Sequence, residues 1–155
     1  MVQRIQTLYL FLALVLMVLL LVFPAAQIIG EDMQLYQFKI SGVYELSGSG
    51  SALYMLSWPL LILQVIIMII NLFAIFLFKR RRLQMRLCIY NILLLAGMMG
   101  LMYYYLSFTF RETSATEYSY KLPFVLPLIA MVLTYLAFRA IRKDEILVRS
   151  IDRIR

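Results

Sequence analysis

The chain has 155 residues, of which 64% are hydrophobic, and its formal net charge is +7. Because soluble domains contain about 45–50% apolar residues, this composition excludes an ordinary soluble domain. The sequence has no histidine and a single cysteine, Cys88, which excludes an intrachain disulfide and the Ser-His and Cys-His pairs of nucleophilic catalysis. It also argues against a metal site built from His or Cys, and Cys88 is expected to be a small packing residue.

Four apolar segments without a charged residue fill most of the chain. They cover about residues 5–29, 52–78, 87–110 and 122–138. About 20 helical residues cross the hydrocarbon core of a bilayer, and a backbone inside lipid must satisfy its own hydrogen bonds. The pattern therefore predicts an all-α membrane protein, a four-transmembrane-helix bundle that forms a single integral membrane domain over residues 1–155.

The first segment is interpreted as a retained span, because it exceeds the roughly 7–15 apolar residues of a cleaved signal sequence. Pro24 is expected to end or kink this helix near its outer end. Beyond it, residues 36–40 alternate between apolar and polar, and a Ser-Gly turn signal precedes residues 43–46. These features predict a small extracytoplasmic β-hairpin, which a flexible connector over residues 47–51 joins to the second span.

Basic residues gather on one side of the predicted membrane. Arg4, the link over residues 79–86 and the tail after Phe138 together hold 12 of the 15 Lys and Arg residues. The two other links hold five of the eight acidic residues. The positive-inside rule then predicts that both termini and the 79–86 link are cytoplasmic, which explains the basic link without nucleic-acid binding.

The tail over residues 139–155 is predicted to continue as a cytoplasmic C-terminal amphipathic helix. Apolar residues recur at helical spacing in it, with basic residues beside them. Such a helix suits docking either on the anionic inner leaflet or on a partner protein, and the sequence favours neither. The docking residues are expected to be Arg142, Leu147, Arg149, Ile151, Arg153 and Ile154.

Polar residues inside the predicted spans are few and uncharged. Gln64 and Asn71 are seven residues apart and share one helix face, and Asn91 lies toward the same cytoplasmic side as Asn71. Amides of this kind hydrogen-bond between helices, whereas a substrate path usually brings an ionisable residue into a span. We therefore expect these three amides to hold helices together.

The third span contains a pattern of small residues, Ala96 and Gly100 with Gly97 beside them. Small residues let two helix backbones approach closely, either inside the bundle or against another subunit. Aromatic residues crowd the outer boundary over residues 103–110 and 118–120. Interfacial anchoring is the favoured explanation for them, and a ligand-binding aromatic cage is the alternative.

The start and the end of the chain resemble a known protein family. The first stretch is MVQRIQTLYL at residues 1–10, and the second is RAIRKDEILVRSIDRIR at residues 139–155. Both are similar to an uncharacterised family of small four-span proteins from Bacteroidetes, known as domain of unknown function 4293. The resemblance covers the whole chain and implies a bacterial inner membrane, but it implies no activity and no catalytic residues.

The sequence favours a function without catalysis. We expect a structural or accessory subunit of a larger bacterial inner-membrane protein assembly, with membrane lipids and other integral membrane proteins as partners and without a cofactor. One alternative is a small transporter or channel that acts as an oligomer. Another is a membrane enzyme acting on lipid, for which only four acids lie at the membrane edge: Glu31, Asp32, Glu112 and Glu117.

Overall fold

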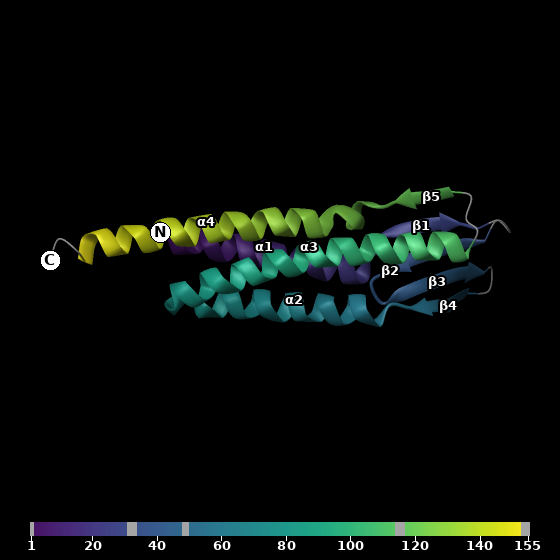
Figure 1. Cartoon of the computed structure of the whole chain (residues 1–155), viewed down its shortest axis with the longest axis horizontal. Coiled ribbons are helices and arrows are strands. Elements are labelled where there is room, and N and C mark those ends of the chain that lie inside the picture. Colours follow the sequence, from purple (N-terminus) through teal and green to yellow (C-terminus); the bar gives the residue numbers. More distant parts are fainter. Residues whose placement is uncertain (1, 31–33, 48–49, 114–116, 153–155) are drawn as a thin grey trace.

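The chain folds into four long helices and one small antiparallel sheet (Figure 1). The computed structural model describes residues 2–30, 34–47, 50–113 and 117–152, and within these it describes residues 2–4, 47, 50–51, 79, 118 and 147–152 by their backbone only. The elements in chain order are α1 (Val2–Val22), β1 (Ala26–Ile29), β2 (Leu35–Lys39), β3 (Gly42–Ser47), β4 (Gly50–Leu56), α2 (Trp58–Phe76), the short 3₁₀ helix η1 (Leu77–Lys79), α3 (Arg81–Glu112), β5 (Glu117–Tyr120), the 3₁₀ helix η2 (Leu122–Val125) and α4 (Leu126–Asp152).

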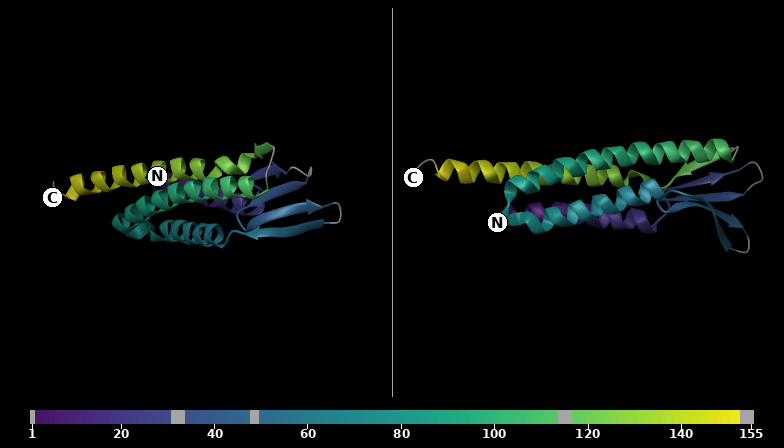
Figure 2. Two further views of the ribbon diagram at one scale, coloured as in Figure 1. Left: turned by 45° about the vertical axis from the view of Figure 1, so that its right-hand side comes forward. Right: turned by 60° about the horizontal axis from the view of Figure 1, so that its bottom comes forward.

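The helices form an up-down-up-down bundle. Helix α1 packs against α2 and α4, and α3 packs against the same two helices, so α1 and α3 lie diagonally across the bundle. Both termini and the α2–α3 connection lie at one end, which we call the terminal end, and the sheet lies at the other, the sheet end (Figures 1 and 2). The last turns of α4 extend beyond the other helices at the terminal end (Figure 1).

Each of the four helices is long and apolar enough to cross a membrane, which confirms the four predicted helical segments. Helix α3 has 32 residues. At 1.5 Å per residue it is about 48 Å long, against about 30 Å for the hydrocarbon core of a bilayer. Helix α3 is thus longer than the hydrocarbon core is thick, and it extends at both ends past the apolar segment predicted at residues 87–110.

The sheet has five strands in the order β4-β3-β2-β1-β5, and each pair of neighbours is antiparallel. The predicted hairpin is confirmed as β2 and β3, which a two-residue turn connects at Ile40 and Ser41. Gly42 follows this turn, where an added Cβ would lie 2.6 Å from the carbonyl oxygen of Met55. Only glycine lets β3 and β4 approach so closely, next to an irregularity in their pairing at Val43.

Two strands, β1 and β4, replace structure that the sequence assigned otherwise. The first helix ends at Val22, two residues before Pro24, and residues 26–29 of the predicted span form β1. Residues 50–56 form β4, so the predicted flexible connector is largely paired in the sheet and the second helix begins only at Trp58. Residues 48 and 49 of that connector lie outside the described part of the chain.

The core follows a repeat of seven residues on α1 and α2. Their buried residues are spaced alternately by four and three positions, a period of 3.5 that is typical of bundles in which side chains interlock between helices. The same spacings occur on α3 and α4 without strict alternation. On α1 and α2 these buried residues are Gln6, Leu10, Ala13, Met17 and Leu20, and Leu60, Gln64, Ile67, Asn71 and Ala74.

The buried apolar side chains form two separate clusters. The sheet-end cluster joins the helices to the inner face of the sheet, and its members include Met17, Leu60, Met102, Ile28 and Phe38. The terminal-end cluster is small and takes residues from all four helices: Leu10, Ala74, Cys88, Ala137 and Ile141. Cys88 is thus a buried packing residue, as expected.

Candidate functional site

The helices place polar side chains inside the bundle and large apolar side chains outside it. Buried polar residues occur on all four helices and are Gln6, Gln64, Asn71, Gln84, Asn91, Thr109 and Thr134. Large apolar side chains that are more than half exposed also occur on all four, among them Leu8, Phe73, Phe76, Leu93 and Val132. This polarity is the reverse of that in a soluble protein, where polar residues are mostly exposed.

Two asparagines form a polar layer between the two core clusters. Asn71 lies between Ile67 of the sheet-end cluster and Ala74 of the terminal-end cluster, and Asn91 lies in the same way between Leu95 and Cys88. Their side chains are 1% and 2% exposed. The sequence predicted that both amides lie toward the same end, but neither amide makes a hydrogen bond to a described residue.

Two glutamines connect helices through hydrogen bonds. Gln64 Nε2 on α2 donates to the carbonyl oxygen of Met17 on α1 at 2.7 Å, in the bridging role expected for it. Gln84 Nε2 on α3 donates to the carbonyl oxygen of Ala74 on α2 at 2.9 Å. The sequence analysis missed Gln84, although it lies seven residues before Asn91 and therefore on the same helix face.

The predicted small residues of α3 lie on the surface of the bundle. Ala96, Gly97 and Gly100 are all exposed, and an added Cβ on Gly97 or Gly100 would meet no atom within 4 Å. They therefore do not bring two helices of this chain together. Contact with another subunit, the other alternative, stays a prediction. We call these three residues the small-residue face.

A groove with a basic rim lies between α3 and α4 near the terminal end. We call it the basic groove, and its volume is about 490 Å³. It is lined by Arg82, Met85, Arg86 and Ile89 of α3 and by Phe138, Arg142, Glu145 and Ile146 of α4.

Two ion pairs join α3 to α4, one within the lining of the basic groove and one next to it. Arg81 Nη1 lies 3.3 Å from Asp144 Oδ2, and Arg82 Nε lies 3.5 Å from Glu145 Oε1. Both acids come from the part of α4 beyond Phe138. The first turns of the predicted tail are therefore a helix held against α3.

Most of the predicted docking residues in the tail lie beyond the described side chains. Arg142 is exposed and lines the basic groove. Leu147, Arg149 and Ile151 belong to the helical backbone of α4, but their side chains are not described. Arg153 and Ile154 lie outside the described residues. The predicted helical continuation of the tail is thus confirmed as far as Asp152, and its docking stays a prediction.

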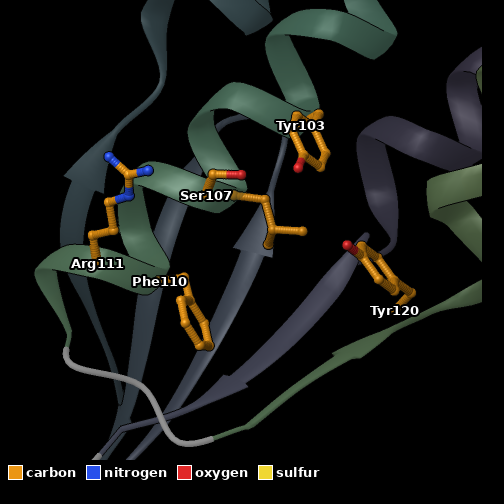
Figure 3. A pocket seen from close by; sticks show the side chains of 6 residues that line it. Tyr103, Ser107, Phe110, Arg111 and Tyr120 are labelled. Atoms are coloured by element: carbon orange, nitrogen blue, oxygen red, sulfur yellow. The ribbon is translucent and has the colours of Figure 1, made fainter.

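A second pocket lies at the sheet end, between α3 and β5. Its volume is about 230 Å³, and it is lined by Tyr103, Leu106, Ser107, Phe110, Arg111 and Tyr120. Figure 3 shows Tyr103 and Tyr120 on opposite sides of this pocket and the guanidinium of Arg111 at its edge. Tyr103 and Tyr104 are more than half exposed. Aromatic and hydroxyl groups at this level suit interfacial anchoring, and the pocket is the place where an aromatic cage would form.

The acids considered for lipid chemistry do not form a described cluster. Glu112 and Glu117 are exposed at the sheet end, whereas Glu31 and Asp32 lie outside the described residues. Among the residues that the structure describes, no group of three or more His, Cys, Asp and Glu side chains is placed to hold a metal ion.

A comparison with known protein families gives a match over almost the full length of the sequence. The family described as Domain of unknown function (DUF4293) matches residues 2–154, which is nearly the whole chain. No curated protein matches the sequence.

Proposed function

The chain belongs to the DUF4293 family, and from that premise we propose that it is an integral membrane protein of the bacterial inner membrane that crosses the bilayer four times. The inverted polarity of the bundle supports this proposal. In water, four helices with exposed Leu, Ile and Phe side chains would present far more apolar surface than soluble monomers show. In hydrocarbon the same side chains match their solvent, and the buried amides are kept away from it.

The charge distribution supports an orientation with both termini in the cytoplasm. The described basic residues of the α2–α3 connection and of the end of α4 lie at the terminal end, together with both chain ends (Figure 1). Cytoplasmic ends of spans carry an excess of Lys and Arg. The sheet would then lie on the outer surface of the membrane.

Cysteine labelling in intact cells tests this topology. Ser119→Cys on β5 should react with a membrane-impermeant thiol reagent, whereas Lys143→Cys on α4 should react only after the cells are permeabilised. Both positions are exposed, and the native Cys88 is buried and serves as the unreactive background. Labelling of Lys143→Cys in intact cells would refute the proposed orientation.

Within the membrane, the function that we propose is that of a non-catalytic accessory subunit in a larger protein assembly. The observation that carries this proposal is the small-residue face of α3, whose three residues are exposed and whose two glycines have room for a Cβ with no described atom within 4 Å. Small residues in a span allow the close backbone contact on which helix association in lipid depends. Exposed glycines contribute nothing to the packing of their own bundle, so their use is expected to be contact with a second membrane protein.

The variant Gly100→Leu tests contact with a partner protein without affecting the folding of the bundle. Since an added Cβ meets no atom within 4 Å, the bundle should keep its helix content and thermal stability. Partner retention after mild-detergent purification should fall about tenfold, which corresponds to about 1.4 kcal/mol of association free energy.

Two matched variants control this experiment. Gly100→Ala keeps the residue small, and Val132→Leu adds a methylene group to an exposed position of α4. Both should retain the copurifying proteins that mass spectrometry identifies. If Gly100→Leu retains them as well, the small-residue face meets only lipid and the accessory-subunit proposal loses its support.

A small transporter or channel is the second candidate, and the polar layer at Asn71 and Asn91 is the observation that favours it. Buried amide groups that make no hydrogen bond to a described residue can receive a polar solute. However, the buried polar side chains within the described part of the bundle are all uncharged. Substrate and ion pathways in membranes are usually marked by ionisable residues, so this candidate ranks below the accessory subunit.

A further inference from the structure

The basic groove combines an apolar floor with a cationic rim. Met85 and Phe138 are half-buried and pack against the terminal-end cluster, so they form the floor. Ile89 adds an apolar side chain that is 44% exposed, four residues after Met85 on α3 and toward the middle of the bundle. Arg82, Arg86 and Arg142 are exposed around this floor. The groove therefore offers apolar contact along its length and positive charge at its edge.

The positive charge of the rim is only partly compensated. Glu145 is the one acidic side chain among the groove's lining residues, and its carboxylate is already engaged by Arg82. Asp144, the next acid on α4, pairs with Arg81 outside the groove. Arg86 and Arg142 make no ion pair within the described part of the chain. Two guanidinium groups thus remain available for an anion.

The position of the groove indicates which kind of anion would bind in it. The groove lies where α3 and α4 leave the apolar segments, next to the ion pairs of the terminal end. A phospholipid supplies a phosphate at this level and an acyl chain along the apolar floor in one molecule. Basic pockets between spans on the cytoplasmic side bind anionic headgroups in this way. The volume of about 490 Å³ lies within the roughly 300–1,000 Å³ of small-molecule sites.

We propose that the basic groove is a binding site for an anionic phospholipid, with Arg86 and Arg142 on the headgroup phosphate and Met85, Ile89 and Phe138 along the upper acyl chain. This proposal rests on the proposed membrane-spanning function. It gives the chain a defined lipid ligand, which is distinct from general attraction of the tail to a charged leaflet. The carboxylate of Glu145, which also lines the groove, is paired with Arg82.

The test uses the full-length protein in nanodiscs that contain phosphatidylglycerol and phosphatidylcholine, with bound lipid counted by native mass spectrometry. Arg86→Gln/Arg142→Gln should weaken phosphatidylglycerol retention about 30-fold, since each basic residue near the surface contributes about one kcal/mol. The control Arg139→Gln/Lys143→Gln removes the same charge from exposed positions of α4 outside the groove. It should change retention less than about threefold. Arg86→Lys/Arg142→Lys keeps the charge and should retain most of the lipid.

Several outcomes would overturn the groove proposal. Equal losses in the two Gln double variants would mean unspecific attraction of charge, and equal retention of phosphatidylcholine would mean that no anion is recognised. Displacement of the lipid by millimolar inorganic phosphate would assign the site to a free anion. If the Gln variant loses helix content, phosphatidylglycerol with a photoreactive acyl chain replaces it as the test on the unaltered protein. Crosslinks should then concentrate on residues 82–89 and 138–146, and an even spread over all four helices would refute the site.

Alkaline carbonate extraction tests the membrane-spanning proposal separately from the proposal of a lipid site in the groove. A protein that carbonate releases from membranes would refute the membrane-spanning function itself. A protein that stays in the membrane, but whose Arg86→Gln/Arg142→Gln variant retains phosphatidylglycerol normally, would refute the groove alone.

Discussion

The two halves of the bundle core contain different types of residue. At the sheet end, Leu60, Met98 and Met102 continue without interruption into the strand residues Ile28 and Phe38, in one apolar cluster. At the terminal end, the same helix faces carry four amide side chains, together with small residues: Gln6, Asn71, Gln84 and Asn91, with Ala74, Cys88 and Ala137. Each half has one glutamine that bonds a neighbouring helix, Gln64 at the sheet end and Gln84 at the terminal end. The halves therefore differ in the size of their apolar side chains and in the number of amides that they bury.

Because of this difference, the stability of each half of the core depends in its own way on whether water or hydrocarbon surrounds it. The sheet-end cluster includes residues outside the proposed hydrocarbon region, where burial of apolar surface from water stabilises it. In hydrocarbon that driving force is absent, and helices associate through packing and hydrogen bonds. Four of the five described buried amides lie in the half of the core that no strand covers, where they can specify the register of the helices, as a buried Asn does in coiled coils.

The largest effect is expected from truncation at the sheet end. Phe38 is fully buried between the sheet and the helices, so Phe38→Ala should lower the free energy of unfolding by about 3–5 kcal/mol, the usual cost of this change in a core. Thermal unfolding in mild detergent, followed by circular dichroism, measures it. Leu53→Ala on β4, where the side chain is 52% exposed, is the control and should cost far less. Equal losses would mean that the sheet is not part of the core.

A smaller effect is expected in the terminal half of the core. Gln84→Leu removes the hydrogen bond to the carbonyl oxygen of Ala74 and should cost about 0.6–1.7 kcal/mol, the range for side-chain hydrogen bonds within membranes. Asn91→Leu, on the same face of α3, removes no hydrogen bond to a described residue. Its cost should be near zero, or the variant should be stabilised, because an apolar group of similar shape replaces a buried amide. A loss at Asn91 as large as that at Gln84 would show that the polar layer is bonded, and would favour a solute or water within it.

Much of the helical architecture could be predicted from the sequence, because a span must be long and apolar whatever surrounds it. The hairpin of β2 and β3 was also predictable, since its residues alternate and its turn is short. The strands β1 and β5 were not, because four residues give too little alternation and their pairing joins distant parts of the chain. Strand β4 was assigned to the second span because Leu53, Tyr54, Met55 and Leu56 read as a continuous apolar run.

The candidate site residues could also be predicted only in part from the sequence. Spacing alone placed Gln64 and Asn71 on one helix face, and both are buried there. The same rule applied to Gln84 and Asn91 would have found the second glutamine bridge. Spacing could not show whether Ala96 and Gly100 face inward or outward, because small residues suit either surface. The basic groove was hidden as well, since Arg86 and Arg142 come from different helices and only the packing of α3 against α4 brings them to one place.

The pairing between β1 and β5 affects the order in which the parts of the protein fold. Strand β1 follows the first helix and can pair with β2 as soon as both have emerged, whereas its other neighbour, β5, is synthesised only after α3. Until then β1 is an edge strand with unpaired backbone groups on one side. Contacts between residues so far apart in sequence form slowly, because the intervening chain must first be ordered. Completion of the sheet therefore coincides with the arrival of the fourth helix, so that a nascent chain in which only three helices have formed still carries an open strand edge.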